Sequence, residues 1–176
     1  FWPLGLGYSL IIGSIVLKLR RLVILFEGKT NNYEKALSID PNFENAIFNI
    51  GACYVNKAVE IIDEENKKID ANSKYKPDES KYFPLLNKAA DFFSQYRSNV
   101  ANKDNLGVLQ QLSDIYLITR QNDKFKKIVI DLEAAEPANL TNVSYYEYMG
   151  KIYAKQGLKD KADAAFRMAD TLKKNK

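Results

Sequence analysis

The stretch NAIFNIGACY, residues 45–54, decides how this chain is expected to fold. Ile47, Ile50 and Tyr54 recur at helical spacing, yet Gly51 stands in the middle of the expected helix. A glycine inside a helix costs about 1 kcal/mol relative to alanine. We therefore expect another backbone or a large ring to lie against Gly51, in the space that a side chain would otherwise occupy.

The same pattern returns twice further along the chain. The copy nearest the C-terminus consists of Tyr146, Met149, Gly150 and Tyr153. The copy between them consists of Leu109, Leu112, Ser113 and Tyr116. In each copy the small residue follows the first apolar residue by four positions, so the two share a helical face. The pattern predicts that a second helix approaches over the small residue and that the tyrosine ring closes the gap.

A matching second helix is expected after each copy. Its apolar positions are Ala89, Phe93 and Tyr96, then Phe125, Val129 and Leu132, then Ala162, Phe166 and Ala169. The step from Tyr116 to Tyr153 is 37 residues, close to the period of about 34 of helix-turn-helix solenoids. The step from Tyr54 to Tyr116 is longer, at 62 residues, which indicates an insertion at about 57–81.

These residues resemble the tetratricopeptide repeat (TPR) family. Its motif pairs apolar-x2-Leu-Gly-x2-Tyr on one helix with Ala-x3-Phe-x2-Ala and a later Pro on the next, and the resemblance covers residues 33–174. It implies an all-α fold in which antiparallel helix-turn-helix repeats stack as a right-handed α-solenoid. A generic helical bundle is the alternative. We expect a repeat domain over 29–176, preceded by an apolar N-terminal segment at 1–28.

Hydrophobic spacing predicts helices near 43–71, 80–98, 105–120, 123–135, 143–156 and 159–174. The pair Asp40-Pro41 is expected to end a preceding helix, because proline disfavours a helical residue before it. The segment ANSKYKPDES, 71–80, is expected to be a loop. The carboxylates of Asp63, Glu64 and Glu65 just before it are expected on a solvated helix face.

Composition excludes several chemistries. The chain has no histidine, which removes Ser-His and Cys-His nucleophiles and most transition-metal sites. Its one cysteine, Cys53, is expected to be a small buried thiol. The net charge is only +4, and Lys and Arg do not form long runs, so nucleic acid is not expected as a partner. We expect no catalytic residues, no metal and no cofactor.

The N-terminal segment, 1–28, does not follow the repeat pattern. FWPLGLGYSLIIGSIVL is apolar almost throughout and is followed by KLRR. The segment fits a degenerate first repeat, a membrane anchor or a foreign segment, and the sequence leaves all three open. The uninterrupted apolar run ends at Leu17, short of the roughly 20 residues that span a membrane. The compartment also stays open between cytoplasm and periplasm, with or without membrane association.

The resemblance implies a non-catalytic scaffold that binds a protein or peptide segment on the concave face of the solenoid. Side chains on the first helices of the repeats would line that face: Asn45, Phe48, Asn49, Gln110, Gln111, Asp114, Glu147, Tyr148 and Lys151. Amides bond a peptide backbone in both senses, and Phe48 and Tyr148 offer apolar anchors. The alternative is a structural subunit of a bacterial envelope assembly, tethered to the membrane through residues 1–28.

Some TPR proteins hold the C-terminal carboxylate of a chaperone with Lys, Asn and Arg at fixed groove positions. Here Phe48, Ala52 and Gln111 stand at such positions. This departure argues against a carboxylate clamp and leaves the partner unnamed.

Overall fold

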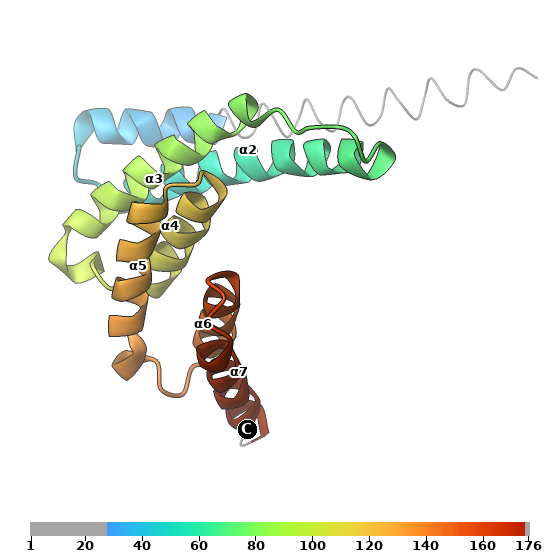
Figure 1. Ribbon diagram of the computed structural model, residues 1–176. Coiled ribbons are helices and arrows are strands. Elements are labelled where there is room, and N and C mark those ends of the chain that lie inside the picture. Colours follow the sequence, from blue (N-terminus) through green and yellow to red (C-terminus); the bar gives the residue numbers. More distant parts are fainter. Residues whose placement is uncertain (1–27, 175–176) are drawn as a thin grey trace, which may run out of the picture. The chain divides into compact units, whose positions relative to one another are not determined.

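The computed structural model describes residues 28–174, and over this range the chain is all-α with no strand (Figure 1). Residues 28–39 are helical. The helices that follow are α2 (Glu44–Ala71), α3 (Phe83–Ser98), α4 (Leu106–Ile118), α5 (Asn122–Ala134), α6 (Val143–Lys155) and α7 (Lys159–Lys174). Short 3₁₀ turns lie at Glu79–Lys81, Val100–Asn102 and Glu136–Ala138. The all-α fold class is confirmed.

The predicted helices are present, with boundaries that shift by three residues or fewer. The largest difference is at α3, which begins at Phe83 because 79–81 form a separate 3₁₀ turn capped by the Asp78 side chain. The starts of α4 and α6 are fixed by asparagine caps: the side chains of Asn105 and Asn142 each accept a backbone N–H three residues on.

The part of the chain that the structure describes divides into two compact units, with the boundary between Tyr96 and Arg97. In the first unit, α2 and α3 form an antiparallel pair, since Gly51 in the first half of α2 lies against Phe93 in the second half of α3. Gln95 donates from its amide to the carbonyl oxygen of Pro41 at 3.3 Å. This bond ties α3 to the turn that follows residues 28–39.

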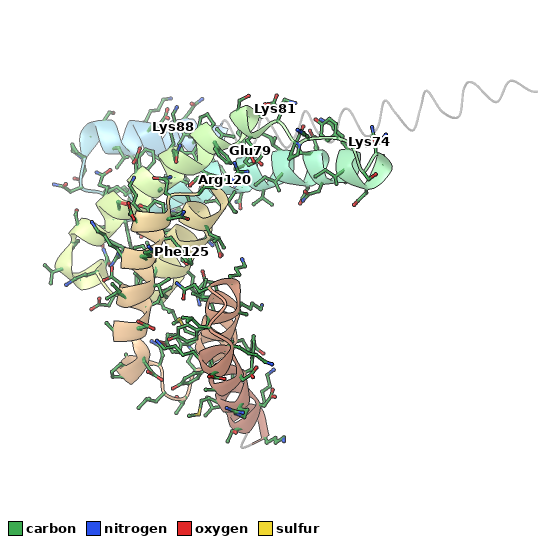
Figure 2. The ribbon with its side chains drawn as sticks, in the orientation of Figure 1. Lys74, Glu79, Lys81, Lys88, Arg120 and Phe125 are labelled. Atoms are coloured by element: carbon green, nitrogen blue, oxygen red, sulfur yellow. The ribbon has the colours of Figure 1, made fainter. Side chains whose placement is uncertain are left out.

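The second unit consists of the end of α3 and two stacked helix hairpins, α4–α5 and α6–α7. Phe125 of α5, labelled in Figure 2, is buried together with Leu109 and Leu112 of α4. The hydroxyl of Tyr145 on α6 is buried and donates to the carbonyl oxygen of Leu132 on α5 at 2.9 Å. The second unit therefore has the TPR-like helical-repeat organisation, one hairpin resting on the next.

The turns inside the two hairpins share one backbone geometry. Arg120 after α4 and Gly157 after α6 both adopt positive φ, 58° and 75°, and they stand 37 residues apart like the repeat tyrosines. The next residue in each turn, Gln121 or Leu158, donates its N–H to the carbonyl of the repeat tyrosine, at 2.8 and 2.9 Å. The repeat thus extends to the backbone of the turn, with glycine used in only one copy.

Gly51 and Gly150 are both buried under a phenylalanine ring of the following helix. A Cβ on Gly51 would lie 2.9 Å from the ring of Phe93, and one on Gly150 would lie 2.6 Å from the ring of Phe166. The close approach expected from the sequence is confirmed. The expectation that tyrosine closes the gap is wrong: a tyrosine three residues on lies a turn away along its own helix, so the covering ring comes from the next helix.

The repeat tyrosines instead carry lysines over their rings. Lys124 lies 5.4 Å from the ring centre of Tyr116, and Lys161 lies 5.1 Å from that of Tyr153. Both lysines follow their tyrosine by eight residues. Tyr54 stacks on the ring of Phe92 at 6.0 Å and is covered by Lys88 at 5.5 Å. A cation over the tyrosine ring is thus a second feature common to the three copies.

The expectations for the apolar N-terminal segment concern residues 1–27, which lie outside the described residues. Within 28–174, no helix has both the length and the apolar character needed to cross a membrane. Cys53 is 8% exposed, as expected for a small buried thiol.

Candidate functional site

Three of the predicted binding residues are brought together on one face of α4 and α6. The hydroxyl of Tyr148 donates to the carbonyl oxygen of Gln110 at 3.0 Å and lies 3.1 Å from Oδ1 of Asp114. Side chains predicted from the sequence on two helices, 34 residues apart, thus touch. We call the surface formed by Gln110, Gln111, Asp114, Tyr148 and Lys151 the α4/α6 face.

Asp114 is the residue of this face whose charged form is disfavoured by burial. Burial raises the pKa of its carboxyl, and the Tyr148 hydroxyl and the nearby Lys155 and Lys151 oppose that rise. Burial also raises the pKa of Tyr148 well above its usual range, so its hydroxyl stays protonated and acts as a donor. The face therefore holds a carboxylate, that of Asp114, which is partly shielded from water and accepts one hydrogen bond, from the hydroxyl of Tyr148.

The other predicted binding residues of α4 and α6 differ in what they contact. Gln111 and Lys151 are exposed. Glu147 pairs with Lys173 of α7 at 2.5 Å, and this lysine holds the pKa of the glutamate carboxyl below its usual range. Glu147 therefore links α6 to α7, while Gln111 and Lys151 leave their polar ends in solvent.

The predicted binding residues of α2 form a separate group in the first unit. Phe48 is 36% exposed, and its ring lies 5.8 Å from that of Phe93 and 5.4 Å from that of Tyr96. The amide of Asn49 donates to the carbonyl of Asn45 at 2.6 Å. Phe48 thus extends the aromatic packing over Gly51, with one edge of the ring in solvent.

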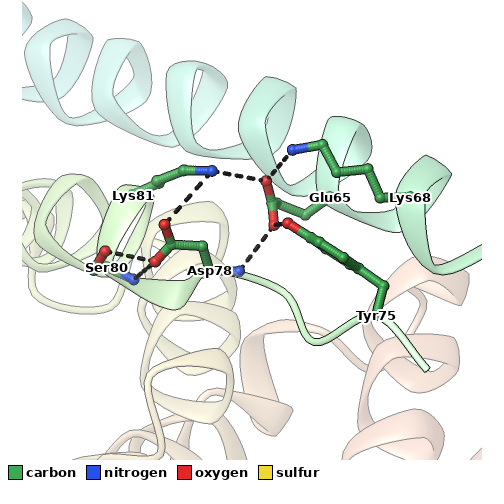
Figure 3. A network of polar contacts seen from close by, with 6 residues as sticks. All are labelled: Glu65, Lys68, Tyr75, Asp78, Ser80 and Lys81. Carbon is green, nitrogen blue, oxygen red and sulfur yellow. Dashed lines mark hydrogen bonds and ion pairs between the residues drawn. The ribbon is translucent and has the colours of Figure 1, made fainter. Parts of the chain in front are cut away.

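The solvated-face expectation is wrong for Glu65, which is 2% exposed. Figure 3 shows its carboxylate at the centre of a polar network. The four donors are Lys68 at 2.6 Å, Tyr75 at 2.6 Å, the backbone N–H of Asp78 at 2.8 Å and Lys81 at 3.2 Å. Asp63 and Glu64 are exposed as expected. The segment after α2 folds back over this one carboxylate and covers it.

The donors around Glu65 stabilise its charged form. The hydrogen bond from Lys68 contributes most, followed by those from Tyr75 and from the Asp78 backbone, and together they hold the pKa of the carboxyl far below its usual range. Glu65 in turn raises the pKa of both Lys68 and Lys81. A carboxylate with this many donors is a poor proton acceptor, so the network has a structural role: it joins the segment that follows α2 to α2 itself.

A second feature that the sequence did not reveal is a cleft of about 480 Å³ in the second unit. It is lined by the end of α5, by the following 3₁₀ turn, and by α6 and α7. Glu133 and Glu136 contribute carboxylates to it, and Tyr145, Tyr146 and Tyr153 contribute rings. The repeat motif includes Tyr146 and Tyr153, but Tyr145 and the two carboxylates belong to no part of that motif.

Among residues 28–174 there is no group of three or more His, Cys, Asp or Glu placed to hold a metal ion. Cys53 is buried in α2.

No family model matches the sequence, and no curated protein matches it. Among solved structures, the chain is similar to one described as the crystal structure of MamA. The two are 17% identical, and the similarity covers 89% of this chain and 93% of that one with a TM-score of 0.42. This is a distant likeness, from which neither a family nor a function follows.

Proposed function

We propose that the chain is a non-catalytic protein–protein interaction module whose binding surface is the α4/α6 face. The carrying observation is the contact of Tyr148 with Gln110 and Asp114, which joins polar groups of successive repeats into one surface. The bound segment is an extended peptide, because amides and a carboxylate on neighbouring helices match the alternating donors and acceptors of a peptide backbone.

Asp114 is the hydrogen-bond acceptor that a bound peptide would use. Its carboxylate is partly desolvated and Tyr148 provides one donor, so an N–H from a bound peptide would satisfy remaining acceptor capacity. Gln111 and Lys151 flank it with exposed polar ends. Gln111 can donate and accept, and Lys151 favours a carboxylate or carbonyl of the ligand.

The test is selection of peptides from a random displayed library on the immobilised full-length chain, followed by affinity measurements with synthetic copies. The variant Gln111→Ala/Lys151→Ala removes one amide and one ammonium from the α4/α6 face. The matched control Asn122→Ala/Lys126→Ala removes the same two groups from exposed positions of α5. We expect the first variant to weaken binding about tenfold or more, as for the loss of one or two polar contacts, and the control to bind like wild type.

Two results would contradict the proposal. If no peptide sequence is enriched, the proposal that the chain is a peptide-binding module is contradicted. Enriched peptides that bind both double variants equally well would show that the ligand lies on another surface.

A further inference from the structure

A second site lies on the other side of α6, in the cleft between the end of α5, α6 and α7. Tyr145, Tyr146, Met149 and Tyr153 of α6 line this cleft, whereas Tyr148 and Lys151 lie on the α4/α6 face. At about 100° per residue, the two groups occupy different sides of one helix. The cleft can therefore take a ligand independently of the surface proposed above.

The cleft already contains one cation, supplied by the protein itself. The ammonium of Lys161 lies 5.1 Å from the ring centre of Tyr153 and 3.1 Å from Oε1 of Glu133. The hydroxyl of Tyr153 donates to the same carboxylate at 2.9 Å. An aromatic face combined with a carboxylate is the environment that binds ammonium and guanidinium groups.

The cleft holds more negative charge than Lys161 neutralises. Glu136 lines it as a second carboxylate and accepts the hydroxyl of Tyr146 at 3.2 Å. Among the residues that the structure describes, no lysine or arginine forms an ion pair with Glu136. Two carboxylates against one ammonium leave one negative charge without a cation, beside the buried rings of Tyr145 and Tyr146 and the half-buried ring of Tyr153. A ligand that neutralises this charge must carry a positive group with several hydrogen-bond donors.

We propose that this cleft binds an arginine side chain of a partner protein, whose guanidinium lies over Tyr153 and pairs with Glu133 and Glu136. Arginine fits better than lysine because its planar fork of five donors serves two carboxylates and stacks on a ring, whereas an ammonium is a single point of charge. Lys161 is 59% exposed on its side chain and swings out to solvent when the guanidinium enters.

The methionines of the chain give this proposal a direct readout. The sequence contains two methionines, Met149 and Met168, and both line the cleft. In protein labelled with ¹³C at the methionine methyl groups, the signals of Met149 and Met168 therefore report on the site. The probes are the capped peptide Ala-Arg-Ala, the same peptide with citrulline, which has the shape of arginine without its charge, and the same peptide with lysine.

We expect the arginine peptide to shift both methyl signals in a saturable way, the lysine peptide to bind more weakly and the citrulline peptide to leave them unchanged. Glu136→Gln keeps the shape of an exposed side chain and should weaken the arginine peptide about tenfold, the effect of losing one charge-assisted hydrogen bond. Asp163→Asn removes one charge from an exposed position of α7 outside the lining and should change nothing.

The substitution Lys161→Gln is expected to change the affinity for the arginine peptide in the opposite direction to Glu136→Gln. If Lys161 competes with the ligand, its replacement should tighten the arginine peptide several-fold, a result that general damage to the fold would not produce. The proposal is overturned if the methyl signals do not move, if citrulline moves them equally, or if Glu136→Gln and Asp163→Asn behave alike. None of these outcomes bears on peptide binding at the α4/α6 face, which depends on Gln111 and Lys151.

Discussion

The ring of Phe166 on α7 lies over Gly150 on α6 so closely that a Cβ at position 150 would be 2.6 Å from Cε1 of the ring. Phe93 covers Gly51 in the same way, at 2.9 Å. Each contact joins a helix to the next helix of the same unit: α2 to α3 in the first unit, and α6 to α7 in the second. Glycine in these helices is therefore required by the neighbouring ring, and this outweighs its poor helix propensity.

Gly150→Ala should destabilise the protein by about 1–3 kcal/mol, the usual cost of overpacking, although alanine is normally the better helix former. The measurement is chemical unfolding of the two proteins. In a double-mutant cycle, Phe166→Leu should recover part of the loss because it removes the ring that the new methyl group meets. Strictly additive effects of the two substitutions would contradict close packing at this point.

Glu65→Gln should lower the thermal stability at pH 7, because a neutral amide cannot satisfy two lysines, a tyrosine hydroxyl and a backbone N–H. The matched control is Glu64→Gln, the same change at the exposed neighbour, which should have little effect. Equal effects of the two substitutions in melting experiments would contradict the structural role of the network.

The pH dependence of Glu65 has a defined sign. Its pKa is lowered in the folded protein, so its contribution to the free energy of unfolding is complete above the unfolded-state pKa of about 4.3. The contribution declines as the pH falls below that value toward the folded-state pKa. The gap in melting temperature between wild type and Glu65→Gln should therefore narrow below about pH 4. A gap that stays constant down to pH 2 would contradict this assignment.

Asp114→Asn removes a charge as Glu65→Gln does, but the expected effect is opposite. Burial raises the pKa of Asp114, so its charged form weakens the fold as the pH rises from about 3.9 through the folded-state pKa. Asparagine still accepts the Tyr148 hydroxyl, and only the attraction to Lys151 and Lys155 is lost. We expect a higher melting temperature than wild type at pH 7 and no difference at pH 3. A lower melting temperature at pH 7 would contradict a desolvated carboxylate.

Helix positions and the close approach at glycine could be predicted from the sequence because both follow from local periodicity. Which ring covers the glycine could not, since Phe166 lies 16 residues beyond Gly150 and its contact depends on the turn between the helices. The burial of Glu65 was missed for the same reason. Lys68 is one helical turn away, but Tyr75 and Lys81 lie 10 and 16 residues on, along a segment whose path no hydrophobic period records.

Two further glycines should respond in opposite directions to the same substitution. Gly157 adopts a φ of 75°, and a Cβ there would meet no atom within 4 Å, so Gly157→Ala should cost about 1 kcal/mol through backbone strain alone. Gly107 lies exposed in the first turn of α4, where a Cβ would make an ordinary 3.5 Å contact with Asn105. Gly107→Ala should stabilise by about 0.4–1 kcal/mol, chiefly by restricting the unfolded chain. An unfolding midpoint of Gly157→Ala that does not fall would show that the turn after α6 does not require positive φ, and a lower midpoint of Gly107→Ala would contradict the expected gain at that position.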